Sequence, residues 1–191
     1  MAAAPIIWIN AFPGTGKFTV AKVLGTLIPK SVVIDNHQLI DPVTLSRDHP
    51  CYQTERKKER EKAFNEYVFN PRWAEHTIIF TDSQTTDLLG EAVAREYQAA
   101  AEAAKRPFTP VYLTCDCEVN ITRATSHERL QGGTTKLTDA KIIRDIRSRC
   151  KIFRFEAGDR QPCSIDTTTL TPADAASKII EYCQGLGLLK S

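Results

Sequence analysis

Residues 8–25 read WINAFPGTGKFTVAKVLG, and this stretch is the strongest indication of the fold. It overlaps a short apolar run, residues 6–10, that is rich in β-branched side chains and typical of a buried strand. Gly14 and Gly16 follow shortly afterwards. Apolar residues then recur at helical spacing until Pro29 ends the predicted helix. The stretch therefore predicts a strand, a glycine-rich turn and a helix in direct succession.

Strands and helices continue to alternate along the rest of the chain. Further strands are predicted at residues 31–35, 76–82, 110–116 and 163–168. Further helices are predicted at residues 52–69, 85–106, 118–130, 137–150 and 171–183. Their predicted N-caps include Asp116, Thr138 and Thr171, and a loop with two prolines is predicted at 36–50. The strands are continuous apolar runs, which favours an α/β fold with a five-stranded parallel sheet covered on both faces.

Composition and charge exclude several classes of protein. The chain has 191 residues, of which 42% are hydrophobic and 25% charged, and it has no internal linker, so residues 1–191 are predicted to form one soluble domain. A formal net charge of +2 is too small to favour nucleic acid as a partner. No signal peptide and no apolar stretch of membrane-spanning length is visible, so we expect a cytoplasmic protein with no membrane partner.

The cysteines predict reduced thiols. Six are present, none in a C-x-x-C pair, as expected for a cytosolic chain of this length. Cys115 and Cys117, with His127 ten residues further on, lack a convincing fourth ligand for zinc. A zinc site is therefore not predicted.

Residues 11–18 match the Walker A pattern G-x-x-x-x-G-K-[ST] at all but two positions. Ala11 stands in place of the first glycine, and Phe18 in place of the hydroxyl that binds magnesium. The segment nevertheless follows a strand and opens a helix, which is the context that a phosphate-binding loop requires. Its glycines allow backbone N–H groups to surround phosphate oxygens, and Lys17 can reach the β- and γ-phosphates. We therefore predict a nucleotide-binding loop.

The loop residues predicted to contact ATP are Pro13, Gly14, Thr15, Gly16, Lys17, Phe18 and Thr19. Phe18 can offer only its backbone N–H to phosphate. The hydroxyl of Thr19 lies one residue further on, where it can contact the α-phosphate.

Residues 13–19, P-G-x-G-K-x-T, resemble the loop of adenylate kinases and related small-molecule kinases. Residues 32–43, VVIDNHQLIDPV, resemble the acceptor segment of shikimate-kinase-like and chloramphenicol-phosphotransferase-like proteins. Residues 113–139 resemble their lid region, and residues 163–180 their closing strand and helix. The resemblance implies a three-layer P-loop NTPase fold with a short lid at about 124–137. It also implies ATP and Mg²⁺ as cofactors, and transfer of the γ-phosphoryl group to a small hydroxyl-bearing or nucleotide acceptor.

The resemblance assigns the acceptor side of the site to the ends of two predicted strands. Asp35 is expected to orient or deprotonate the acceptor hydroxyl, with capping of a turn or helix as its alternative role. Asn36, His37 and Gln38 are expected to contact the acceptor, together with Asp82. The alternative roles are a hydrogen-bonded loop residue for His37 and a turn-former before Ser83 for Asp82. The predicted magnesium ligands are Thr19, Asp35 and Asp82.

The phosphate side of the site is assigned to arginines beside the segment QGGTTK, whose glycines suit a moving lid. Arg123 and Arg129 are expected to bind the nucleotide and the transferring phosphate. Arg144 and Arg147 lie on one stripe of the next predicted helix, where they either reach inward or form a basic solvated face.

Two alternatives to a kinase remain: an ATP-hydrolysing, nucleotide-gated interaction protein, and a protein that binds nucleotide or a partner without chemistry. Phe18 supports both, and the mixed-charge segment 54–62, which otherwise indicates a solvated helix face, supports a partner surface.

The acceptor of a kinase is also left open. The arginines between the second and third predicted strands are Arg47, Arg56, Arg60 and Arg72. None lies in a recognisable motif for clamping an acceptor phosphate, which favours a neutral or hydroxylated acceptor over a nucleoside monophosphate.

Overall fold

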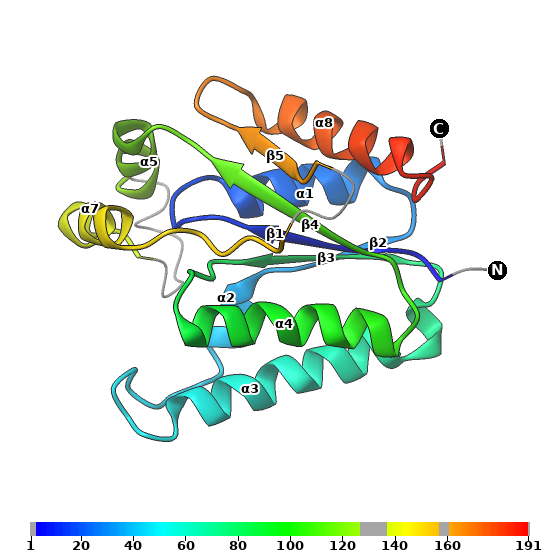
Figure 1. Cartoon of the computed structure of the whole chain (residues 1–191), viewed down its shortest axis with the longest axis horizontal. Helices are drawn as coiled ribbons and strands as arrows, with labels where there is room; N and C mark the ends of the chain where they lie inside the picture. Colours follow the sequence, from blue (N-terminus) through cyan, green and yellow to red (C-terminus); the bar gives the residue numbers. More distant parts are fainter. Residues whose placement is uncertain (1–2, 127–136, 157–160, 191) are drawn as a thin grey trace.

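The computed structural model describes residues 3–126, 137–156 and 161–190. Figure 1 shows one central sheet with helices on both faces. Its strands are β1 (Ile6–Asn10), β2 (Ser31–Ile34), β3 (Thr77–Asp82), β4 (Phe108–Thr114) and β5 (Cys163–Asp166). All neighbouring strands pair in parallel, in the order β2-β3-β1-β4-β5. The predicted α/β fold with a five-stranded parallel sheet is therefore confirmed.

The helices form two layers and a cap. One face of the sheet carries α1 (Lys17–Leu27) and α8 (Pro172–Gly185). The other carries α3 (Tyr52–Ala63), which continues into a π-helix (Phe64–Phe69), and α4 (Leu88–Ala103). Beyond the carboxyl ends of the strands lie α5 (Cys117–Ala124) and α7 (Ala140–Arg149). Two short elements complete the described fold: α2 (Asn36–Ile40) and a 3₁₀ turn (Pro71–Trp73).

The sheet is buried on both faces because successive side chains of each strand point to opposite sides. Trp8 points into the layer of α3 and α4, where its ring centroid lies 5.9 Å from that of Tyr97. Ile7 and Ile9 point into the layer of α1 and α8. Two apolar clusters result, one on each face, which explains why the strands read as continuous apolar runs.

Several local predictions hold and others change. Asp116 and Thr171 cap α5 and α8 as predicted. The N-cap of α7 is Asp139 rather than Thr138, because the Asp139 carboxylate accepts from two first-turn N–H groups and also interacts favourably with the helix dipole. The predicted loop 36–50 contains α2, whose first turn is closed by a capping box between Asp35 and Gln38.

The solvated helix face predicted for residues 54–62 is wrong for two arginines. Arg56 is 9% exposed and Arg60 is 3% exposed. Positions 52, 56, 60 and 63 fall on one stripe of α3, and that stripe faces the protein interior. Mixed charge therefore describes the outer face of α3 but not its inner face.

None of the six cysteines, all of which lie in described residues, forms a disulfide bond. No group of three His, Cys, Asp or Glu side chains within 3–126, 137–156 and 161–190 has the arrangement of a metal site. In the same described ranges, no helix has the length and apolar character needed to span a membrane.

Arg106 holds the edge of the fold together near the amino ends of the strands. Its guanidinium donates to the carbonyl oxygens of Ala4 at 2.9 Å, of Tyr67 and Trp73 at 3.3 Å each, and to that of His76. The residue is 4% exposed, and burial lowers the pKa of its guanidinium. Tyr67 and Trp73 lie in the π-helix and the 3₁₀ turn, and Ala4 and His76 precede β1 and β3, so Arg106 joins these segments through their carbonyl oxygens.

Arg106→Met should lower the free energy of unfolding by about 3 kcal/mol, because the carbonyl groups of four half-buried residues lose this donor. The matched control is Arg95→Met on α4. Arg95 is exposed and paired with Glu91 one helical turn away, so its loss should cost less than about 0.5 kcal/mol. Urea unfolding of both variants checks the difference. Equal losses would contradict a role for Arg106 as a buried hydrogen-bond centre.

Candidate functional site

The loop between β1 and α1 has the backbone of an anion-binding turn. Gly14 and Gly16 adopt positive φ angles of 84° and 93°. Gly16 directly precedes α1, so the free N–H groups of the first helical turn face the loop. The hydroxyl of Thr15 donates to the carbonyl oxygen of Phe12 at 2.8 Å, which tightens the turn.

Helix α5 holds this loop in place. The side-chain amide of Asn120 donates to the carbonyl oxygen of Pro13 at 2.7 Å. A Cβ on Gly14 would lie 2.6 Å from Asn120 Nδ2 and 2.7 Å from the Cβ of Ala124. Only a glycine therefore fits against α5 at this position. The sequence analysis did not identify Asn120 as a contact of the loop.

Lys17 begins α1, and its side chain folds back over the loop. The Nζ atom lies 3.3 Å from the carbonyl oxygen of Ala11 and 3.4 Å from that of Phe12. Arg147 of α7 covers the same turn from outside: its guanidinium lies 5.3 Å from the Phe12 ring centroid and donates to the carbonyl oxygen of Cys115 at 2.9 Å. Arg147 is therefore directed onto the loop rather than forming a solvated face, and its contacts are with protein groups.

Two cavities open on either side of this loop. The first cavity, of about 420 Å³, is lined by Pro13 and Lys17, by residues of α2, α3, α4 and α7, and by the segment after β3. The second cavity, of about 580 Å³, is lined by Gly14, Thr15, Gly16, Phe18, Thr19 and residues of α5 and α8. The loop lies at the carboxyl edge of the sheet, where α/β folds bind their ligands.

The second cavity has a basic and an aromatic wall. Arg123 of α5 lines it and donates to the carbonyl oxygens of Thr167 and Thr168 at 2.9 and 3.2 Å. Phe18 also lines it, with the Lys22 ammonium 5.2 Å from the ring centroid. The second cavity thus brings together Arg123 and the loop residues Gly14 to Thr19 apart from Lys17, whereas Pro13 and Lys17 of the predicted ATP-contacting set line the first cavity. Arg129, predicted to join them, and most of the lid predicted at 124–137, lie outside the described residues.

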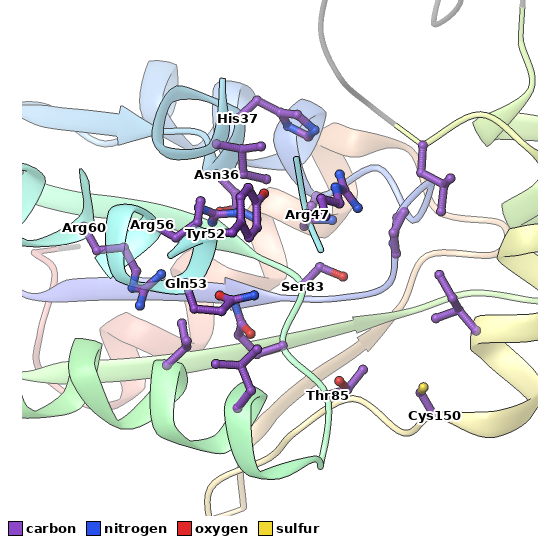
Figure 2. A pocket seen from close by; sticks show the side chains of 18 residues that line it. Asn36, His37, Arg47, Tyr52, Gln53, Arg56, Arg60, Ser83, Thr85 and Cys150 are labelled. Carbon is purple, nitrogen blue, oxygen red and sulfur yellow. The ribbon is translucent and has the colours of Figure 1, made fainter. Parts of the chain in front are cut away.

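The first cavity contains polar residues from several elements. Figure 2 shows Asn36 and His37 of α2, Tyr52, Gln53, Arg56 and Arg60 of α3, and Ser83 and Thr85 after β3. Asn36 and His37 are thus in the cavity beside Lys17, where the sequence analysis expected an acceptor. Arg56 and Arg60 were considered from the sequence but not predicted as site residues, because they lie in no recognisable motif and their charges are interspersed with those of the exposed face of α3.

Asp35 lies at the end of β2, next to the lining residues of the first cavity. It is buried, its Oδ1 accepts from the Thr81 hydroxyl at 2.7 Å, and its Oδ2 lies 3.3 Å from His37 Nδ1. Asp35 is also the N-cap of α2, so the capping role considered for it is present. Its predicted catalytic role stays a prediction.

Asp82 ends β3 and is fully buried on the sheet face covered by α3 and α4. Its Oδ1 accepts from the Ser83 backbone at 2.8 Å and from Gln84 Nε2 at 2.7 Å. Burial raises the pKa of this carboxyl, although these hydrogen bonds and the charges of Arg56 and Arg60 oppose the rise. Asp82 is not among the described lining residues of either cavity. Its roles toward acceptor and metal remain predictions.

The described residues do not build a magnesium site by themselves. Phe18 has no hydroxyl group, and no carboxylate is among the described lining residues of either cavity. Thr19 lines the second cavity, whereas Asp35 and Asp82 line neither. Protein-bound magnesium commonly takes one or two carboxylates together with substrate phosphates. The described lining residues supply no such carboxylate, so the mechanism proposed below includes no metal held by the protein.

No protein-family model and no curated protein matches the chain. Solved structures do match it. A tunicamycin resistance protein from Deinococcus radiodurans is 20% identical, with a TM-score of 0.56 over 96% of each chain. APS kinase from Mycobacterium tuberculosis, in complex with AMPPNP and APS, is 12% identical, with a TM-score of 0.58 over 96% of this chain and 99% of that one.

Shikimate kinase from Acinetobacter baumannii, in complex with shikimate, is 17% identical, with a TM-score of 0.55 over 97% of this chain and 96% of that one. The chain therefore has the three-layer fold of the P-loop small-molecule kinases, and this prediction is confirmed.

Gly14→Ala and Gly16→Ala form a matched pair that tests how the loop is held. Both place a Cβ at a positive φ, at a cost of about 1–2 kcal/mol. Nothing lies within 4 Å of a Cβ at Gly16, whereas the Cβ at Gly14 meets α5. Gly14→Ala should therefore lower the free energy of unfolding by about 1–3 kcal/mol more than Gly16→Ala. Urea unfolding measures both, and equal losses would show that α5 does not constrain the loop.

Proposed function

We propose that this chain transfers the γ-phosphoryl group of ATP to a hydroxyl group of a small acceptor. The observation that carries the proposal is that one glycine-rich loop lines two cavities, with Lys17 on the first and Phe18 and Thr19 on the second. A protein that only binds or hydrolyses ATP needs a donor cavity but no second cavity for an acceptor. The APS kinase structure, which has the same fold, contains both AMPPNP and APS.

The second cavity is the proposed donor site. Backbone N–H groups of the loop and of the first turn of α1 bind phosphate oxygens. Arg123 and the Phe18 ring line the space beside the loop, where the base and ribose of a nucleotide have room. Lys17 neutralises charge on the β- and γ-phosphates.

The first cavity is the proposed acceptor site. The acceptor oxygen forms a bond to the γ-phosphorus while the bond from that phosphorus to the β,γ-bridging oxygen breaks, and ADP leaves. The hydroxyl proton passes to Asp35, which lies beside the lining residues Asn36 and His37. The Thr81 hydroxyl holds Oδ1 of this carboxylate, which orients Asp35 for the transfer.

Transfer of labelled γ-phosphate from magnesium–ATP into a pooled set of metabolites tests the proposal. The native chain should produce labelled organic products. Lys17→Met should reduce the rate by about 10²–10³-fold, because the charge that stabilises the transferring group is lost. Label released only as inorganic phosphate would instead support an ATP-hydrolysing protein. ATP binding without turnover would support a protein that only binds nucleotide.

Asp35→Asn separates the catalytic role of Asp35 from its capping role. Asparagine is as good an N-cap as aspartate, and its amide oxygen can still accept from the Thr81 hydroxyl. The variant should therefore unfold at the same urea concentration as the native chain. Its kcat for the labelled product should fall by about 10²–10⁴-fold, with the KM for ATP nearly unchanged. An unchanged kcat would show that Asp35 serves only as a helix cap.

A further inference from the structure

The inner stripe of α3 places two buried arginines in the first cavity. Tyr52, Arg56 and Arg60 follow one another at intervals of about one helical turn, and all three line the cavity. In Figure 2, Arg56 and Arg60 lie toward one end of the cavity and Cys150 toward the other. Burying a guanidinium is costly unless it is paired and hydrogen-bonded. The partners of these two side chains therefore show whether they serve the fold or a ligand.

Other buried or half-buried arginines of the chain bind several acceptors each. Arg106 donates to four carbonyl oxygens. Arg123 donates to two carbonyl oxygens and to a hydroxyl of the segment after β5. Arg147 donates to a carbonyl oxygen and to Asn120. These side chains join segments of the fold to one another.

Arg56 and Arg60 have fewer acceptors. Arg56 donates from Nη2 to Asn36 Oδ1 at 3.2 Å, and Arg60 donates from Nε to Glu96 Oε2 at 2.7 Å. Within the described ranges, their remaining N–H groups have no hydrogen-bond acceptor, and Arg56 Nε is buried without one. A guanidinium carries five N–H donors. Within the described ranges, most N–H donors of Arg56 and Arg60 therefore have no hydrogen-bond acceptor.

The charges facing the cavity are of one sign. Its described lining includes the cations Lys17, Arg47, Arg56 and Arg60 and no aspartate or glutamate. The nearby carboxylates are Glu96, which pairs with Arg60 Nε, Asp35, which is buried beside the lining residues Asn36 and His37, and Asp82, which is fully buried. Uncommitted guanidinium donors in a cavity of positive charge match the oxygens of a carboxylate, sulfate or phosphate group.

The rest of the wall indicates an organic ligand rather than an inorganic ion. Apolar side chains line the cavity from α2, α4 and α7 and from the segment before α7: Ile40, Leu89, Val93, Ile146 and Leu137. The volume of about 420 Å³ is far larger than one phosphate group and falls within the usual size range of ligand pockets.

We propose that the acceptor is a hydroxyl-bearing organic anion whose carboxylate, sulfate or phosphate group is bound by Arg56 and Arg60. This inference rests on the proposed function, because it names the substrate class of the same site. The anionic group binds at the arginine end of the cavity, and the hydroxyl group lies toward Lys17. A neutral or hydroxylated acceptor was expected from the sequence, because no phosphate-clamping motif was visible. The proposal keeps the hydroxyl group and adds an anionic group.

Calorimetric titration with inorganic phosphate tests the arginine site without any transfer reaction. The titration uses the Lys17→Met variant, because this substitution weakens the binding of phosphate at the loop. The ionic strength is held constant. The variant should bind phosphate saturably. Adding Arg56→Lys, which keeps the charge but removes the planar fork, should weaken binding about tenfold. Adding Arg95→Lys on the exposed face of α4 should leave binding unchanged.

Two outcomes of the titration would overturn the proposal: no saturable binding to the Lys17→Met chain, or equal binding to the Arg56→Lys and Arg95→Lys chains. Titration with acetate in place of phosphate distinguishes a carboxylate-binding site from a phosphate- or sulfate-binding site.

The native chain supplies a second measurement that does not depend on the folding of any variant. A metabolite pool is separated by anion exchange into neutral and anionic fractions, and each is offered in the labelled transfer assay. Label should enter the anionic fraction, and label in the neutral fraction would overturn the proposal. If neither fraction is labelled, the proposed function fails, and the phosphate titration alone decides whether Arg56 and Arg60 bind an anion.

Discussion

The contact between Gly14 and α5 is the constraint on which the arrangement of the site depends. The loop after β1 turns with positive φ angles and lies against Asn120 and Ala124 without room for a single extra carbon atom. Asn120 also binds the carbonyl oxygen of Pro13. The loop is therefore held from outside the sheet, and its N–H groups and Lys17 have a defined position between the two cavities. This is the preorganisation that phosphoryl transfer requires, since positioning and charge neutralisation supply most of the catalysis.

The buried arginines of this protein differ in their hydrogen-bond partners. Arg106 donates to four carbonyl oxygens, so it joins the segments before β1 and β3 to the π-helix and the 3₁₀ turn. Arg56 and Arg60 are equally buried but have one hydrogen bond each within the described ranges. The same residue type thus has a structural role in one place and donors available for a ligand in another. Only the number of hydrogen-bond acceptors around each guanidinium distinguishes the structural arginine from the two with available donors.

Much of the fold was predictable, because it depends on patterns that are local in sequence. The β-branched runs indicated the strands, and Asp116 and Thr171 indicated the starts of two helices. The loop residues Gly14 to Thr19 and Arg123 were identified from their spacing and from resemblance to small-molecule kinases. The cap of α7 was misplaced by one residue because Thr138 and Asp139 are both good N-caps, and only the backbone geometry selects between them.

The sequence by itself determined the order of strands and helices, the glycine-rich loop and the residues at the carboxyl ends of the strands. These follow from local propensity, hydrophobic period and backbone freedom, which act over a few residues. Only the tertiary structure decided which charges are buried. Arg56 and Lys57 are neighbours of similar chemistry, yet Arg56 is buried in the first cavity and Lys57 is exposed. The packing of α3 against α2 and α4 sets that difference, because contacts between segments distant in sequence determine which stripe of a helix is withdrawn from water.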